Sequence, residues 1–402
     1  MLNPSLALLA SIAGILILLR LRVHSGLAVF AGSLIISLLV LPPRFTPGLM
    51  LQTLLDYQTL RLLAIIASAL TLSRLMEVKG MLTKLAASME RIGPRLAMHL
   101  TPAVIGLVPM PAGALVSGTA LQDLVKRMGL TPERATFINY WFRHIWEYSL
   151  PVYPAIIMVS VILSVQLSSV VTTLLPMTAL AIAVGAASSY RILKLKKAQE
   201  TREKSSGNIA YNLLRASWPV LLLVPLILLG VDAVIAFPAT LALLALQQRV
   251  KWAELKKALK YGLDPKILFL LYAVMLYKTI IEGSGTASTL FFDMQTIGLP
   301  ALVILAALPL LIGFATGASI AVVGIAFPLL VPFMTSDSGI NSYALLLAYT
   351  SGEAGVLLSP VHLCLILSAE YFKAKLAKVY RYILPPLLPI EAVAIVIYWI
   401  AA

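Results

Sequence analysis

Two glutamates lie at matching points of two similar motifs in otherwise apolar segments. Glu147 belongs to NYWFRHIWEYSLPVYP, residues 139–154, and Glu353 belongs to AYTSGEAGVLLSPVHL, residues 348–363. In each motif a Pro follows the Glu by seven residues and is expected to interrupt the helix. A carboxylate within a membrane-spanning helix costs about 2.5 to 3.5 kcal/mol or more, so such residues usually serve a function. We predict that both glutamates bind a coupling ion, either a proton or sodium.

The first motif also carries positive charge. Arg143 offers a planar fork of donors that matches a carboxylate or phosphate, and His144 and Asn139 add further polar groups. We predict these three residues as substrate ligands. Two alternatives stay open: Arg143, one helical turn before Glu147, only neutralises that carboxylate, and His144 is only a hydrogen-bond donor between helices. The aromatic residues around them are more typical of packing than of a binding pocket.

Two other apolar stretches, residues 96–128 and 299–332, are interrupted near their centres by PMPAG and ATGAS. Pro and Gly break a continuous helix, so each stretch is predicted to be a hairpin that enters the membrane and turns back. Small residues let the backbone approach a ligand closely. The candidate substrate-binding residues of the hairpins are Pro111, Gly113, Ser117, Thr119, Thr316, Gly317 and Ser319. The candidate coupling-ion ligands beside Glu353 are Ser351 and Gly352, which are expected to make the helix flexible before Pro360 ends it.

The composition is that of a membrane protein. Hydrophobic residues make up 60% of the 402 residues, and the mean hydropathy is +0.94. Apolar runs near the roughly 20 residues that cross a bilayer are predicted to be transmembrane helices. They cover residues 4–20, 24–42, 57–78, 138–165, 168–190, 213–230, 232–248, 266–282, 342–371 and 384–401.

The net charge of +14 comes from Lys and Arg in short clusters between the apolar runs, where these residues set membrane topology. No soluble basic domain is evident in the sequence, so nucleic acid is not an expected partner. If both hairpins return to the side they entered from, all 31 Lys and Arg except Arg44, Arg61, Arg143 and Lys278 fall on one side. The positive-inside rule makes that side cytoplasmic and places both termini outside, with residues 4–20 as a retained first span.

Cys364 is the single cysteine and lies in an apolar segment. A disulfide framework and a cysteine-based metal site are therefore not expected. We expect no cofactor, and no metal beyond a possible sodium ion.

The chain divides into two related halves, residues 1–190 and 208–402, around a basic linker at residues 191–207. Each half has five predicted spans and one hairpin, an odd number of crossings, so the second half should be inverted relative to the first. Inverted repeats with matching broken helices, here at residues 136–165 and 342–371, are typical of secondary transporters with a site near the bilayer midplane. The residues that recur 205 to 207 positions apart include Glu77 and Glu282, Gly93 and Gly298, Gly106 and Gly313, Glu147 and Glu353, and Pro154 and Pro360.

This layout resembles the ion transporter superfamily, which includes gluconate permeases and divalent anion/sodium symporters. Within that group, PMPAGALVSGT followed by NYWFRHIWEYSLPVYP resembles the prokaryotic integral membrane proteins of domain-of-unknown-function family 401. The resemblance implies an all-α, elevator-type transporter that works as a homodimer in a prokaryotic inner membrane. Relatives carry a Ser-Asn-Thr type motif at the hairpin tips that binds sodium and substrate carboxylate. This chain has VSGT and TGAS instead, without the Asn, which gives proton coupling at least equal weight.

The sequence thus predicts a secondary active transporter of a small organic anion of the carboxylate type, coupled to protons or sodium, with membrane lipid as its other contact. The alternative is a sodium/proton or other cation antiporter that uses Glu147 and Glu353. An intramembrane enzyme is not expected, because the chain has no His-Glu-x-x-His motif and its cysteine has no adjacent base. A passive channel is less favoured, because paired inverted breaks suit alternating access.

Overall fold

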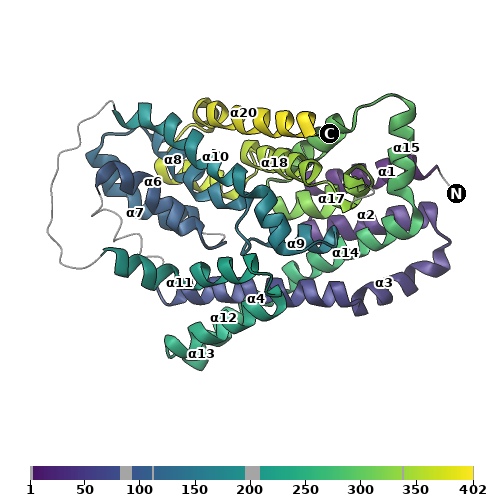
Figure 1. The fold of residues 1–402 in the computed structure, drawn as a ribbon, viewed down its shortest axis with the longest axis horizontal. Coiled ribbons are helices and arrows are strands. Elements are labelled where there is room, and N and C mark those ends of the chain that lie inside the picture. The colour runs from purple at the N-terminus through teal and green to yellow at the C-terminus, as the bar shows by residue number, and fades with distance from the viewer. Residues whose placement is uncertain (1–2, 82–92, 111–112, 195–208, 337–338, 402) are drawn as a thin grey trace.

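The protein is almost entirely helical. A computed structural model describes residues 3–81, 93–110, 113–194, 209–336 and 339–401. Figure 1 shows long helices that lie roughly along the long axis of the molecule. The elements of the first half are α1 (Pro4–Arg20), α2 (Ser25–Val40), the 3-10 turn η1 (Pro43–Phe45), α3 (Thr46–Leu55), α4 (Tyr57–Val78), α6 (Pro94–Gly106), α7 (Gly113–Arg127), α8 (Pro132–His144), the 3-10 turn η3 (Ile145–Tyr148), α9 (Pro154–Ile162) and α10 (Leu167–Lys194).

The second half follows a similar order. Its elements are α11 (Ile209–Leu228), α12 (Ala233–Gln247), α13 (Trp252–Gly262), α14 (Pro265–Ser284), α15 (Thr286–Thr296), α16 (Ala301–Thr316), α17 (Ser319–Met334), the short strands β1 (Thr335–Ser336) and β2 (Gly339–Ile340), α18 (Ser342–Leu358), α19 (Leu363–Phe372) and α20 (Leu376–Ala401).

The helices identify a multi-pass membrane protein. Five helical segments are long and apolar enough to cross a bilayer, namely Tyr57–Val78, Leu167–Tyr190, Trp252–Ser284, Ser342–Phe372 and Leu376–Ala401. Several others, including α1, α2 and α12, are shorter apolar helices. The short helix α3 and the strands β1 and β2 are not predicted by the sequence, because short elements with little apolar periodicity give a weak pattern.

Helix starts are marked by capping side chains. Asn3, Asp56, Asp232, Asp264 and Asn341 each accept a hydrogen bond from a backbone N–H in the first turn of the helix that follows. These side chains satisfy donors that have no partner within the helix. Polar caps of this kind are inexpensive only near water, so they indicate where α1, α4, α12, α14 and α18 begin at a membrane surface.

Both predicted hairpin stretches contain a pair of short helices. In the first, α6 and α7 have 13 and 15 residues and are joined by residues 107–112; in the second, α16 and α17 have 16 residues each. At 1.5 Å per residue these helices span about 20 to 24 Å, which is less than the roughly 30 Å of hydrocarbon. The second turn is built on Gly317, whose φ of 62° is left-handed and suits glycine.

Both helix interruptions lie at or next to the prolines that are expected to cause them. The first is the segment between α8 and α9, where η3 and residues 149–153 replace regular helix. The second interruption lies at residues 359–362 and includes Pro360, as expected, whereas α18 stays helical through Ser351 and Gly352 up to Leu358, so these two residues do not open the helix.

The glycines of α18 serve close packing instead. A side chain at Gly352 would bring its Cβ within 2.6 Å of Val322 on α17, and one at Gly355 would collide with the backbone carbonyl of Leu310 on α16. Small residues thus let α18 lie directly against the second hairpin. This explains why a glycine pair that reads as flexible in the sequence is a rigid packing surface in the fold.

Contacts between the halves occur in matched pairs. Helix α2 packs on α14, and its counterpart α12 packs on α4; likewise α7 packs on α19, and α17 packs on α9. Each hairpin therefore lies against the second part of the broken helix from the other half. Because each hairpin contacts the broken helix of the other half, the two candidate motifs lie in one region.

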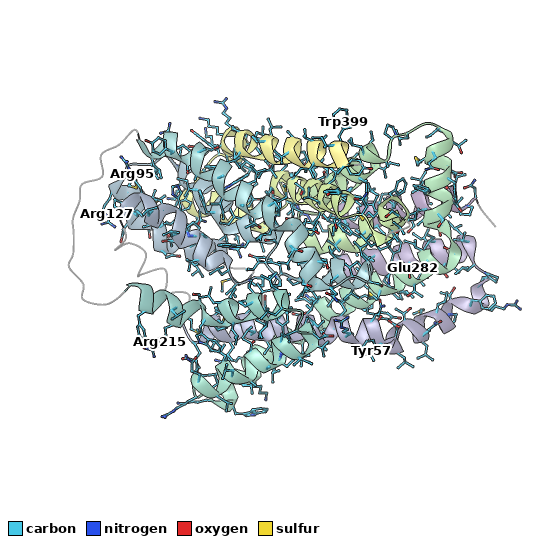
Figure 2. All side chains as sticks on the ribbon, viewed as in Figure 1. Tyr57, Arg95, Arg127, Arg215, Glu282 and Trp399 are labelled. Atoms are coloured by element: carbon cyan, nitrogen blue, oxygen red, sulfur yellow. The ribbon has the colours of Figure 1, made fainter. Side chains whose placement is uncertain are left out.

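Basic residues gather at one end of the molecule. Figure 2 shows Arg95, Arg127 and Arg215, which come from α6, α7 and α11, at the same end. Figure 1 shows the N-terminal end of the described chain at the opposite end. The linker at residues 195–208 and the segment at residues 82–92 lie outside the described residues.

Candidate functional site

Arg143 joins the first hairpin to the broken helices. Its side chain is only 3% exposed at the end of α8, and its Nη2 donates a hydrogen bond of 2.6 Å to the backbone carbonyl of Met110 at the hairpin turn. A Cβ on Gly113 would lie 2.5 Å from the same Nη2, so a larger residue there would force the guanidinium to shift. The Nε atom is buried and has no partner among the described residues.

Two histidines connect the broken helices. His144 Nδ1 lies 2.6 Å from the carbonyl of Tyr140 and must donate to it, which leaves Nε2 as an acceptor in the neutral ring. His362, at the start of α19, approaches with its Nε2 3.2 Å from that atom. His362 Nε2 then carries the hydrogen, and its Nδ1 is a buried acceptor without a partner in the described chain.

The second hairpin closes against the same interruption. A Cβ on Gly317 would lie 2.8 Å from the backbone nitrogen of His362 and 3.0 Å from Ser359 Oγ. Beyond the turn, Ser319 at the start of α17 faces the carboxyl of Glu353, together with Tyr349. The tips of both hairpins and the interruptions of both helices therefore meet in one buried cluster, which we call the central cluster; it consists of Met110, Gly113, Arg143, His144, Glu147, Gly317, Ser319, Glu353, His362 and Cys364.

The two glutamates have different surroundings. Glu147 is 12% exposed, and its Oε1 lies 3.7 Å from His144 Nε2, whereas no ion pair joins it to Arg143. Glu353 is 3% exposed in the interior of α18 and has no ion pair among the described residues. The alternative that Arg143 is retained only as an ion-pair partner of Glu147 therefore receives no geometric support.

Aromatic side chains of the two broken helices satisfy backbone carbonyls near helix ends. Tyr140 donates to Leu357 O at 3.1 Å, and Tyr349 donates to Glu147 O at 2.8 Å. A tyrosine of each broken helix thus satisfies a backbone carbonyl at or near the interruption of the other. Tyr153 donates to Gly106 O at 2.5 Å, and Trp146 donates to Ala103 O at 2.6 Å, both near the end of α6. Carbonyls left over where helices stop need such donors, which accounts for the aromatic density of the first motif.

Several predicted ligands do not converge on the central cluster. Asn139 is fully buried, and its amide nitrogen donates to Ala114 O and Ser368 Oγ, which ties α8 to α7 and α19. Ser117 donates to Gly113 O within its own helix. Thr119 is exposed and bonds to Leu115 O, and Thr316 is half-buried and bonds to Ile312 O. Pro111 lies outside the described residues.

Ser351 contacts a carboxylate outside the set of predicted site residues. Its hydroxyl donates to Glu391 Oε1 of α20 at 2.5 Å, and Glu391 Oε2 is buried without a partner in the described part of the chain. The available signal was an acidic residue inside the apolar run of α20. The contacts that His362 and Cys364 make with α8 could not be read from the sequence, because they join residues more than 200 positions apart.

The cluster contains potential metal ligands. The donor atoms of His144, His362 and Cys364 lie within 4.8 Å of one another, a set that suits a borderline ion such as zinc. Sequence alone had placed Cys364 in an apolar setting, without these neighbours. However, Arg143 Nη1 lies 3.2 Å from Cys364 Sγ and 3.4 Å from His144 Nε2, so a guanidinium already stands among these atoms. Its positive charge favours an anion over a metal cation there.

Comparison with known structures supports a transporter fold. The Alcanivorax borkumensis YdaH transporter, described as having an unusual topology, is similar with a TM-score of 0.62 and 15% sequence identity, over 90% of this chain and 90% of that chain. At this identity the likeness establishes the fold alone. The comparison with curated protein sequences gives no match. A family model for proteins of unknown function, DUF401, matches residues 3–401. The chain therefore belongs to the DUF401 family of membrane proteins.

Proposed function

We propose that this protein is a secondary active transporter that moves a small organic anion of the carboxylate type, and not an enzyme. The main support for this proposal is that the guanidinium of Arg143 is almost fully buried and has no carboxylate partner among the described residues. A buried charge without a partner is costly, so a binding site for the opposite charge is a physical reason to retain it. Its unpartnered Nε leaves a donor for an anion.

The architecture supports alternating access. The halves share an order of elements, and their contacts occur in matched pairs, as expected for two inverted repeats with the site between them. The fold likeness to the YdaH transporter agrees with this arrangement. We further propose, from the sequence resemblance alone, that the protein belongs to the ion transporter superfamily, moves its hairpins and broken helices as an elevator, and works as a homodimer. The arginines at one end support a cytoplasmic location for that end in a prokaryotic inner membrane, with both termini outside.

Protons are the coupling ion that best fits the cluster, with sodium as the other option. Glu147 is 12% exposed and lies in η3 within the first interruption, and Glu353 is buried in α18 before the second, so each could bind and release a proton as the site changes its access. Sodium needs several oxygen ligands; Ser319, Glu353 and the backbone of the second hairpin turn could supply some of them.

Uptake into proteoliposomes tests the anion proposal. A panel of radiolabelled mono- and dicarboxylates is offered under imposed proton or sodium gradients. Arg143→Gln should lower uptake by about 10- to 100-fold, because hydrogen bonds to a charged group are worth about 1.5–3 kcal/mol. The matched control is Arg215→Gln, an exposed arginine on α11 that should leave uptake unchanged. Uptake that ignores both gradients would disprove coupling, and full activity of Arg143→Gln would disprove the assigned site.

A cation antiporter is the second candidate, favoured by the two buried carboxylates of Glu147 and Glu353. In that case the vesicle interior should change pH when sodium is added, without any carboxylate present. Glu353→Gln should abolish this change, and Arg143→Gln should leave it measurable. A sodium-induced pH change that survives Glu353→Gln would exclude this version.

A further inference from the structure

A cavity of about 490 Å³ lies away from the central cluster, between α8, α10 and α20. Figure 1 shows α10 and α20 side by side along one edge of the molecule, in keeping with their direct packing. The residues that line the cavity and matter here are Arg134 and Phe137 of α8, Ser188 of α10, and Arg381, Tyr382 and Pro385 of α20.

The cavity carries two positive charges. Arg134 is half-buried and its Nε donates to Tyr382 Oη at 3.4 Å, which holds the guanidinium at the wall. Arg381 is exposed on α20, directly before Tyr382 in the chain, and also lines the cavity. Neither arginine has an ion-pair partner among the residues that the structure describes. With Ser188 and the Tyr382 hydroxyl beside them, they form a polar recess with an excess of positive charge.

The helix ends around the recess lead us to place it near the level of the lipid headgroups. Helix α8 begins at Pro132, α10 ends at Lys194, and α20 begins at Leu376. Arg134 and Arg381 are therefore within about one and a half turns of helix ends, or about 8 Å along the helix axis. This is the end where the basic residues gather, which we assign to the cytoplasmic side.

An apolar surface continues from the recess toward the membrane centre. On α20, Arg381, Pro385 and Leu388 follow one another at helical spacing, and Leu388 is 64% exposed. On α10, the turn before Ala187 presents the small, exposed Ala183. Among the five long apolar helical segments, α20 and α10 have the smallest shares of buried residues, 28% and 39% of their most apolar parts. We infer that they lie at the outside of the molecule.

A ligand with a negative head and an apolar tail matches both parts. We propose that this recess is a binding site for an anionic phospholipid, with the phosphodiester between Arg134 and Arg381 and an acyl chain along α10 and α20. Basic pockets between transmembrane helices on the cytoplasmic side are suited to anionic headgroups. The site is separate from the transport cluster, so it stands or falls independently of the proposed substrate.

Native mass spectrometry of the full-length protein tests this site. The protein is placed in phosphatidylcholine nanodiscs and titrated with phosphatidylglycerol, and bound lipid is counted. Arg134→Gln and Arg381→Gln should each weaken phosphatidylglycerol binding roughly fivefold, and the double variant about 30-fold, as expected for about 1 kcal/mol per arginine. Arg95→Gln, an exposed arginine at the start of α6, is the control and should bind lipid normally.

Further arms separate the lipid from other occupants. Inorganic phosphate and glycerol 3-phosphate should not compete at millimolar concentration, because they lack the acyl chain; competition would overturn the proposal in favour of a soluble anion. Equal binding of phosphatidylcholine would also overturn it, as would a recess covered by a second copy of the chain whose association weakens in the double variant. The Arg134→Lys, Arg381→Lys variant should restore most binding, which separates loss of charge from loss of folding.

Discussion

The central cluster contains buried polar atoms that lack a hydrogen-bond partner. Arg143 Nε and His362 Nδ1 are buried polar atoms without a partner among the described residues, one a donor and the other an acceptor. Buried polar atoms are nearly always paired, so such exceptions call for an unseen partner. Here a bound anion would take a hydrogen bond from the arginine, and a water or substrate hydroxyl would serve the histidine.

Glu391 is a third carboxylate in this region, and its part in transport can be tested. Its carboxyl accepts from Ser351, and its second oxygen lacks a partner in the described chain. A Gln keeps the acceptor and removes the charge, so Glu391→Gln should fold normally but lower gradient-driven uptake about tenfold if the carboxyl exchanges protons during transport. Glu370→Gln, exposed at the end of α19, is the control. Normal uptake with reduced thermal stability would assign Glu391 a purely structural part.

Interrupted helices and hairpins determine where these side chains meet. The first hairpin turn supplies the Met110 carbonyl to Arg143, and the second packs Gly317 against the nitrogen of His362. Neither turn could approach so closely with larger residues. The geometry of the cluster is therefore set by backbone contacts between elements as much as by its charged groups.

Gly317→Ala tests the packing of the second hairpin turn. A Cβ there would lie 2.8 Å from the backbone nitrogen of His362, and the left-handed φ of 62° adds about 1–2 kcal/mol of strain. We expect a lower thermal unfolding temperature and strongly reduced uptake. Gly283→Ala, in α14 with nothing within 4 Å of the new Cβ, is the control and should be neutral or slightly stabilising. Wild-type uptake by Gly317→Ala would show that the turn does not stay packed on the interruption.

An ion pair between α4 and α12 allows a test of how the halves are held together. Asp232 caps α12 through Val234 N at 2.9 Å and pairs with Arg61 of α4 at 3.1 Å. Partial burial alone would raise the pKa of Asp232, but the Val234 N–H and the Arg61 guanidinium together lower the pKa below its ordinary value. The stabilisation is therefore present above the unfolded-state pKa and is lost as pH falls through the folded-state pKa.

Thermal unfolding of two variants separates the cap from the ion pair. Asp232→Asn keeps an acceptor for the cap and should cost no more than about 0.2–1 kcal/mol near neutral pH, since the pair is half exposed. Asp232→Ala should lose about 1 kcal/mol more. The difference between wild type and Asp232→Asn should vanish in acid. A difference that persists below the folded-state pKa would mean that the carboxylate charge is not the cause.

The basic residues at one end of the molecule predict a single orientation in the membrane. In a Cys364→Ser background, a cysteine at Arg127 or Arg215 should react with an impermeant maleimide only from the cytoplasmic side. A cysteine at Gln295, exposed on α15 at the end away from the basic residues, should react only from outside. In intact cells only the cysteine at position 295 should be labelled, and in inverted vesicles only the cysteine at position 127 or 215 should be labelled. Reaction of Gln295→Cys and Arg127→Cys from the same side would refute the assigned topology.

The sequence by itself determined the membrane class, the short helix pairs at residues 96–128 and 299–332, and the placement of charged residues such as Glu147 and Glu353 in apolar segments, because hydropathy, Pro and Gly act locally along the chain. Tertiary structure decided which of these residues meet. Ser351 and Gly352 read as a flexible break but pack α18 against its neighbours, while Cys364 and Glu391 read as incidental but lie in polar contacts. Such roles depend on helices distant in sequence, since a side chain's partner across a helix interface follows from the fold and not from its neighbours in the chain.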